Sequence, residues 1–394
     1  MRVLFVPDTA SQYGATNSLK ELVCTLEKNK GIEPIIVMNE KNPVFNFFKN
    51  KGYEVHNSIH KAFMINNGRT KIKKIIKICM IPYFYIVYKI SNYISVRNLE
   101  KEIDFSKVDL IHTNVNRNDL GAILAKRHNI KHIWHIREFG KEDYNCFSLR
   151  YKYINFMNKY TSRFIAISNA VANSWIDKGL DKNKINVIYN GVDTEKFEKI
   201  NKERNSKIKI LISGYITTSK GQLQLIKSLK YIPKEIINKL NVDIYGTGNK
   251  EYINLIKEEI ENLKLEKVVS FKGYRENMYE IMPQYDIGVV CSKAEGFGRV
   301  TVEYMMSGLC VIVSNTGANT ELIQNENTGL IYEYNNEKDL ASKIEKIIND
   351  KKLYERISKN GYTFAKDNFT NIINANKVYD IYKKVLNTVV EKDG

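Results

Sequence analysis

The stretch Glu295-Gly296-Phe297-Gly298-Arg299-Val300-Thr301-Val302-Glu303 places two carboxylates eight positions apart, with two glycines between them. The apolar run from Ile287 to Ser292 before it predicts a buried strand, and the sequence from Arg299 to Ser307 predicts a helix. We then expect Glu295 on the loop at the carboxyl end of the strand and Glu303 about one turn into the helix. Open α/β sheets bind nucleotides at this edge, so the stretch predicts a nucleotide site.

Short buried strands alternate with helical stretches along the rest of the chain, which predicts an α/β fold of parallel sheets covered on both faces. A length of 394 residues favours two domains. The polar stretch 193–206 predicts a linker, so we expect domains over 1–200 and 201–369 and a last helix within 370–394. The expected strands are 3–7, 34–38, 108–113, 132–136, 164–168 and 187–189, then 208–213, 242–245, 268–271, 287–292, 310–314 and 330–332.

Together with Met306-Ser307-Gly308 and the apolar run 310–314, the nine residues resemble the E-x7-E signature of retaining glycosyltransferases of family four, of the bacterial polysaccharide type. The resemblance implies the GT-B fold: two Rossmann-like, doubly wound domains with an interdomain cleft, and a last helix that crosses back to the first domain. It also implies transfer of a hexose from a nucleotide diphosphate sugar to a lipid-linked saccharide in cell-envelope polysaccharide or capsule synthesis. A UDP-sugar is favoured over GDP-mannose.

By the same resemblance, Glu295 hydrogen-bonds the transferring sugar, Phe297 and Gly298 present amides to it, and Glu303 holds the ribose hydroxyls. Retention would come from front-face attack, with the departing phosphate accepting the proton of the acceptor hydroxyl. No side-chain nucleophile is then required.

The negative charge that develops on the leaving diphosphate must be stabilised by a metal or by cations and amides. No two aspartates lie two positions apart, so the Asp-x-Asp metal motif is absent and we expect no metal and no cofactor. Residues 213–221 resemble the G-R-x-x-x-x-K-G string of the family, which gives Lys220 a phosphate-binding and catalytic role. Tyr215 stands where arginine is common, so one of the two usual diphosphate cations is either missing or replaced, with Arg299 and Lys293 as the candidate replacements.

Three further segments of the second half are similar to the family. Gly246 lies in a glycine turn expected near the nucleoside, and Tyr274 is expected beside the base. Residues 316–321 resemble the G-G-x-P-E segment, with Thr316 and Asn319 in place of glycine and proline.

In the first half, residues 12–16 resemble the glycine loop beneath the diphosphate, which makes Gly14 and Ala15 candidate diphosphate ligands. His135 ends a predicted strand and matches the histidine that contacts the donor sugar. Further candidates on the acceptor side are His112, Asn114 and Arg137.

The net charge of +17 is concentrated in residues 1–200, which hold 32 lysines and arginines against 19 acidic residues. Between Val55 and Leu99 there are eight basic residues, many apolar ones and no acid. This pattern favours contact of residues 61–97 with an anionic membrane surface, and the alternative is a core helix with a solvated lysine face.

Five cysteines without C-x-x-C spacing, no signal-peptide pattern and no apolar run near 20 residues predict a cytoplasmic protein at the inner face of the plasma membrane. Three other functions stay open. They are a sugar-nucleotide epimerase of GT-B shape, a noncatalytic nucleic-acid-binding protein, and a pyridoxal-phosphate-dependent phosphorylase. Chain length and the lack of a cofactor-lysine string disfavour the last, and the lack of a nucleic-acid-binding motif disfavours the second.

Overall fold

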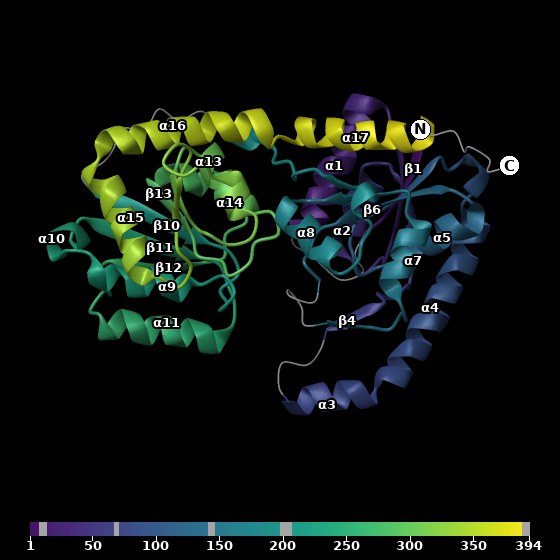
Figure 1. The fold of residues 1–394 in the computed structure, drawn as a ribbon, viewed down its shortest axis with the longest axis horizontal. Coiled ribbons are helices and arrows are strands. Elements are labelled where there is room, and N and C mark those ends of the chain that lie inside the picture. Colours follow the sequence, from purple (N-terminus) through teal and green to yellow (C-terminus); the bar gives the residue numbers. More distant parts are fainter. Residues whose placement is uncertain (8–13, 67–70, 141–145, 198–206, 388–394) are drawn as a thin grey trace. The chain divides into compact units, whose positions relative to one another are not determined.

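The computed structural model describes residues 1–7, 14–66, 71–140, 146–197 and 207–387, and the chain forms two compact units (Figure 1). Unit 1 comprises Met1–Gly191 and Asn371–Gly394, and unit 2 comprises Val192–Thr370. Within the described ranges, no helix combines the length and apolar character that crossing a bilayer requires.

The chain enters unit 2 between Gly191 and Val192, earlier than the boundary near residue 200 that composition suggests. The reason is local pairing: Val192 N donates to Phe369 O at 2.8 Å, and Val192 forms a parallel bridge with Thr370. The polar stretch that predicts a linker continues through residues 198–206, which lie outside the described residues.

Unit 1 is built on a seven-stranded parallel sheet. The strand order is β3-β2-β1-β5-β6-β8-β9, and all neighbouring pairs are parallel. The sequence predicted six of these strands; the alternating, largely polar Glu54–Asn57 was not predicted, and the last strand begins two residues earlier than expected. The strands are β1 (Arg2–Val6), β2 (Glu33–Met38), β3 (Glu54–Asn57), β5 (Leu110–Thr113), β6 (Lys131–Ile136), β8 (Arg163–Ala166) and β9 (Ile185–Val187), and β4 (Met64–Asn66) pairs antiparallel with β7 (Cys146–Ser148).

Helices cover both faces of this sheet because alternate residues of each strand point to opposite faces. On β1, Val3 and Phe5 pack in the core formed with α1, α2 and α17, whereas Leu4 and Val6 pack in the core formed with α4 and α5. The last helix of the chain thus completes the first of these two cores. The helices are α1 (Gly14–Lys30), α2 (Pro43–Asn50), α3 (Lys71–Cys79), α4 (Ile81–Glu102), α5 (Leu120–His128), α7 (Tyr153–Tyr160), α8 (Asn169–Asp177) and α17 (Asn371–Asn387).

Unit 2 repeats the design with a six-stranded parallel sheet in the order β12-β11-β10-β13-β14-β15. All six strands were predicted from the sequence. They are β10 (Ile208–Ser213), β11 (Leu240–Tyr245), β12 (Val269–Gly273), β13 (Ile287–Val290), β14 (Cys310–Ser314) and β15 (Leu330–Tyr332); the helices are α9 (Gln222–Ser228), α10 (Lys234–Ile237), α11 (Lys250–Asn262), α12 (Met278–Ile281), α13 (Arg299–Met306), α14 (Asn319–Leu322), α15 (Glu337–Asn349) and α16 (Lys351–Asn368).

Both sheets are therefore doubly wound, as predicted, and each has one point at which the strand order reverses. In unit 1 the reversal lies between β1 and β5, and in unit 2 it lies between β10 and β13. Loops that leave neighbouring strands at a reversal turn to opposite faces, which opens a crevice at the carboxyl edge of the sheet.

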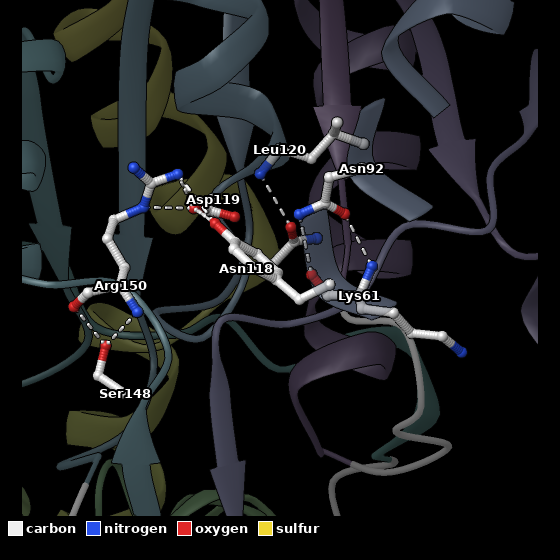
Figure 2. A network of polar contacts seen from close by, with 8 residues as sticks. Lys61, Asn92, Asn118, Asp119, Leu120, Ser148 and Arg150 are labelled. Atoms are coloured by element: carbon white, nitrogen blue, oxygen red, sulfur yellow. Dashed lines mark hydrogen bonds and ion pairs between the residues drawn. The ribbon is translucent and has the colours of Figure 1, made fainter. Parts of the chain in front are cut away.

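One face of α4 is fixed to unit 1 by buried polar contacts, part of which Figure 2 shows. Asn92 accepts a hydrogen bond from Lys61 N at 2.9 Å and donates to Lys61 O at 3.3 Å. One turn earlier, Tyr88 donates to the fully buried carboxylate of Asp119, which also accepts from Arg150 Nε at 2.6 Å. These contacts determine which side of α4 faces the core and which side faces outward.

Candidate functional site

The crevice of unit 2 is lined by the loops that follow β10 and β13. A small pocket lies there, and its walls include Gly214, Lys220, Gln222, Glu295 and Gly298. The two loops are joined by a hydrogen bond from Lys293 N to Ser219 O at 2.8 Å. The pocket thus brings together two stretches that were predicted to bind the donor, residues 295–303 and residues 213–221.

Gly221, in the loop that follows β10, is required by the close approach of two backbone segments. Gly221 has a φ of +68°, and a Cβ there would lie 2.2 Å from Cys291 O. Only glycine permits both the left-handed conformation and the contact. The preceding residue, Lys220, is thereby held against the loop that carries Glu295.

Lys220 and Glu295 form the central ion pair of the pocket, with Nζ 2.7 Å from Oε2. The Glu295 side chain is 16% exposed and the Lys220 side chain 37%, so water reaches the pair from the lysine side. A backbone hydrogen bond also holds the loop that carries Glu295, because Ala318 N donates to Glu295 O at 2.8 Å. This arrangement provides one cation and one hydrogen-bond acceptor at the carboxyl edge of the sheet.

A second ion pair lies at the start of α13, where Arg299 Nε is 2.8 Å from Glu303 Oε1. The predicted placement of Glu303 one turn into the helix is therefore correct. Of the two cations proposed to replace the arginine missing at Tyr215, Arg299 is engaged with this acid. Lys293 is exposed, and within the described residues its ammonium makes no ion pair.

Phe297 and Gly298 lie in the glycine turn between Glu295 and Glu303. Phe297 contributes a buried side chain, and Gly298 a backbone conformation that favours glycine. The Phe297 ring is 4% exposed and packs edge-on against Phe369 with centroids 6.0 Å apart. Gly298 has a φ of +86° and precedes the first residue of α13. The side chain of Phe297 thus belongs to the core, and the predicted contact with a sugar concerns its backbone alone.

Residues 316–321 depart from the family segment at Thr316 and Asn319, which replace glycine and proline, and both side chains make hydrogen bonds. Thr316 Oγ1 donates to Ser292 O at 2.6 Å. Asn319 is fully buried, accepts from Thr301 Oγ1 at 3.2 Å and donates to Ser314 Oγ at 3.3 Å. Both side chains therefore tie this segment to its neighbours: Thr316 to the loop after β13, and Asn319 to α13 and the end of β14.

Gly246 and Tyr274 lie at the carboxyl ends of β11 and β12. A Cβ on Gly246 would lie 1.9 Å from Gly214 O, and Gly246 N already donates to Gly273 O at 2.9 Å. Its amide is thus used within the protein, and its structural role is to let two loops pack. Tyr274 is 64% exposed, beside the end of its strand.

Gln222 is a pocket residue that sequence reasoning missed. It is 1% exposed, its Nε2 donates to Tyr215 O at 3.2 Å, and its Oε1 has no hydrogen-bond partner among the described residues. A buried acceptor without a donor is costly, which points to a ligand donor in the pocket. The only signal in the sequence was its place directly after Lys220-Gly221.

Unit 1 has a separate polar cluster at the carboxyl ends of β5 and β6. Arg137 is 5% exposed and donates from Nε to Asn114 Oδ1 at 2.8 Å and from Nη1 to Asn190 Oδ1 at 2.6 Å. His135 Nδ1 lies 3.2 Å from His112 Nε2. The histidine, asparagine and arginine candidates of the first half are thus brought together.

The predicted glycine loop of the first half reaches the same cluster. Asn114 Nδ2 donates to Ala15 O at 3.2 Å, and Gly14 is the first residue of α1. Gln12 and Tyr13 of that loop lie outside the described residues.

Burial dominates the electrostatics of the two histidines. Both are 0% exposed, and desolvation, followed by the Arg137 charge, lowers the pKa of each imidazole well below its ordinary value. They are therefore neutral at physiological pH. Among the described residues, no three histidine, cysteine, aspartate or glutamate side chains gather in a metal-binding group.

Comparisons with known proteins agree with this architecture. Residues 13–196 match the family described as Glycosyltransferase Family 4, and residues 193–364 match Glycosyl transferases group 1. The chain is 30% identical over 310 residues to an Escherichia coli UDP-Gal:alpha-D-GlcNAc-diphosphoundecaprenol alpha-1,3-galactosyltransferase, covering 73% of this chain and 78% of that one.

Two further proteins illustrate the range of similarity. The capsular polysaccharide biosynthesis glycosyltransferase CapM of Staphylococcus aureus is 32% identical over 243 residues, which are 56% of this chain and 61% of CapM. The crystal structure of Anabaena HepE in complex with UDP superposes with a TM-score of 0.79 at 18% identity, covering 98% of this chain and 100% of HepE. The last comparison shows that the fold is shared.

Proposed function

Because the chain belongs to the group 1 and family 4 glycosyltransferases of GT-B fold, we propose that it transfers a hexose from a nucleotide diphosphate sugar to a lipid-linked saccharide of a bacterial cell-envelope polysaccharide. The transfer retains the anomeric configuration and uses no metal ion. A UDP-sugar is the favoured donor, since the E. coli relative is named for UDP-Gal and HepE was crystallised with UDP. The lipid-linked acceptor is likewise suggested by the name of the E. coli relative.

The observation that carries the proposal is the Lys220–Glu295 pair at the strand-order reversal of unit 2. In this proposal Glu295 accepts hydrogen bonds from sugar hydroxyls, and the ammonium of Lys220, which the ion pair holds beside that carboxylate, also contacts a diphosphate oxygen. A fixed cation at a leaving diphosphate stabilises the charge that appears there when the glycosidic bond breaks.

The two substrates by themselves account for every bond and proton in the reaction. The acceptor hydroxyl oxygen forms a bond to the anomeric carbon on the face from which the diphosphate leaves. The bond between that carbon and the phosphate oxygen breaks, and the hydroxyl proton passes to the departing phosphate. The protein's contribution is to hold the two substrates and to stabilise the diphosphate.

A donor panel tests this function. The full chain is incubated with UDP-, GDP- and ADP-sugars, with and without a diphospholipid-linked saccharide, and nucleotide release is measured in EDTA. We expect release that depends on the acceptor and persists in EDTA. A free sugar or an isomerised donor without acceptor would instead indicate an epimerase, and salt-sensitive retention of DNA or RNA on filters without turnover would indicate nucleic-acid binding.

A nucleotide-binding titration decides which cation, if either, replaces the missing arginine. Lys293→Met and Arg299→Met are compared for nucleotide affinity, and the replacement is the residue whose loss weakens binding by about tenfold or more, as a charge-assisted hydrogen bond would. Equal affinities for both variants and the wild type would refute a role for either.

We also propose that unit 1 rests on an anionic membrane surface, such as the cytoplasmic leaflet, through α3 and α4. Most apolar side chains of α3 and of the N-terminal part of α4, and that of Met80 between them, are exposed, which argues against the alternative of a core helix with a solvated lysine face. Those more than a third exposed are Ile72, Ile75, Ile76, Ile78, Met80, Tyr83, Tyr85, Ile86, Ile90, Tyr93 and Ile94. An apolar surface of this kind, in a stretch of sequence with eight basic residues and no acid from Val55 to Leu99, fits lipid with anionic headgroups.

Sedimentation with vesicles tests the membrane contact. The double variant Ile72→Ser/Ile75→Ser should lose most binding to vesicles of mixed phosphatidylglycerol and phosphatidylcholine, because two apolar side chains no longer insert. Leu255→Ser, which changes an exposed leucine on α11 of unit 2, is the control and should bind like the wild type. Equal binding by all three proteins would contradict the proposal.

A further inference from the structure

Three buried side chains form a chain of hydrogen bonds that links the last helix of the protein to the candidate histidine of unit 1. The Tyr382 hydroxyl on α17 lies 2.5 Å from His112 Nδ1, and His112 Nε2 lies 3.2 Å from His135 Nδ1. All three residues are 0% exposed. The hydrogen bonds between them therefore lie in the interior of unit 1.

Arg137 determines the direction of the hydrogen bonds. Its Nη2 lies 3.4 Å from His135 Nδ1, and a guanidinium can donate but not accept. Nδ1 of His135 therefore bears a lone pair. His112 Nε2, which contacts the same nitrogen, must donate to it.

The positions of the remaining protons follow from the neutral state of the two imidazoles. A neutral His112 with its proton on Nε2 has an acceptor at Nδ1, so the Tyr382 hydroxyl donates there. Burial raises the pKa of Tyr382 well above its ordinary value, so the hydroxyl keeps its proton. His135, with a lone pair on Nδ1, has its own proton on Nε2.

The last donor in this series of hydrogen bonds is the N–H at Nε2 of His135. That nitrogen is buried and has no hydrogen-bond partner among the described residues. Leaving a buried donor unpaired is costly, so its retention points to a partner supplied by a ligand.

We propose that Tyr382 is a positioning residue that acts through His112 to hold the ring of His135 in place, so that the proton on its Nε2 is directed to an oxygen of the sugar substrate. The inference rests on the proposed function, since it takes a sugar to be the ligand. It assigns His135 the role of hydrogen-bond donor and excludes that of general base. It also gives the helix that ends the chain a role at the site.

Nitrogen NMR of the full chain tests the proton positions without any substrate. The protein has six histidines, so selective ¹⁵N-histidine labelling gives few signals, and His135→Gln and His112→Gln assign two of them. At pH 7 we expect both imidazoles of the wild type to be neutral with the proton on Nε2. A proton on Nδ1 of His135, or a charged ring, would overturn the proposal.

The variant Tyr382→Phe removes only the hydroxyl. We expect it to leave His112 Nδ1 without its donor and the ring free to reorient, to shift the His112 and His135 signals accordingly, and to lower the kcat of transfer by about fivefold, the effect of one neutral hydrogen bond. Nucleotide affinity should stay unchanged. Tyr379→Phe, on the same helix but with its ring beside Lys30 and Lys383, should match the wild type in all three measurements.

The outcomes separate this inference from the function on which it rests. If Tyr382→Phe lowers kcat while His135 keeps the wild-type signals, the tyrosine has only a structural role and the inference fails. If the NMR spectra agree with expectation but no sugar nucleotide supports transfer, the proposed function fails instead.

Discussion

Lys220 and Glu295 are 75 positions apart in the chain, yet Lys220 Nζ lies 2.7 Å from Glu295 Oε2. The pair forms because β10 and β13 are neighbours at the strand-order reversal of unit 2, and each residue lies on the loop that leaves one of these strands. An anionic ligand that enters the pocket meets a lysine already fixed in direction by its acid.

Replacing Glu295 should separate catalysis from nucleotide binding. We expect Glu295→Ala to lower kcat by about 100-fold or more, comparable to the loss of a preorganised transition-state contact, and to change the Kd for the free nucleotide little. Rapid-quench transfer assays and calorimetric titration measure the two quantities. Transfer by the variant at the wild-type rate would refute the assigned role.

Replacing Glu303 should have the opposite effect. Glu303→Ala removes the predicted acceptor for the ribose hydroxyls and also the partner of Arg299, so we expect nucleotide affinity to fall by about tenfold. Glu261→Ala, at an exposed position of α11, is the control and should bind as the wild type does. The prediction is wrong if both variants retain full affinity.

Gly246 and Gly273 offer a matched test of backbone packing in unit 2. Both have positive φ, but a Cβ on Gly246 would lie 1.9 Å from Gly214 O, whereas a Cβ on Gly273 would have no neighbour within 4 Å. We expect Gly273→Ala to cost about 1 kcal/mol in free energy of unfolding and Gly246→Ala clearly more, since backbone must move. Calorimetric unfolding of the two variants measures the difference, and equal losses would contradict it.

The contact between Arg150 and Asp119 should be important for the stability of unit 1. Asp119 is fully buried, and burial raises the pKa of its carboxyl despite the opposing effect of Arg150. Arg150→Met leaves this acid without its cation, and we expect a loss of about 3–5 kcal/mol. Adding Asp119→Asn to that variant should recover part of the loss. Urea unfolding followed by the two tryptophans, Trp134 and Trp175, reports on unit 1 alone.

Acid should destabilise unit 1 through His60 and His132. Burial lowers the pKa of each from 6.5 to about 3. Between these values the unfolded state binds a proton that the folded state does not, so stability is complete above pH 6.5 and falls as the pH is lowered towards 3. Each histidine contributes a slope of about 1.4 kcal/mol per pH unit.

Tryptophan-detected urea unfolding at several pH values measures this slope. His60→Gln should reduce it by the share of one proton, whatever the variant does to stability at pH 7.5. An unchanged slope would show that His60 is not the group that titrates.

Several features of the fold could be read from the sequence because they are local. Twelve parallel strands were predicted from apolar runs, and only the alternating, largely polar β3 and the short antiparallel pair β4 and β7 were missed. The domain boundary was placed too late because composition marks where polar residues accumulate, whereas the division depends on the pairing of Val192 with Phe369 and Thr370.

The sequence by itself determined the positions of Glu295 and Glu303 on a loop and a helix, because an apolar strand, a glycine turn and a helix follow each other within a few residues. Only the tertiary structure decided which distant groups meet them. The Lys220 contact, the orphan acceptor of Gln222 and the approach of Tyr382 to His112 over 270 positions depend on strand order and helix packing. Such contacts arise from the burial of whole sheets and helices, which no short stretch of sequence encodes.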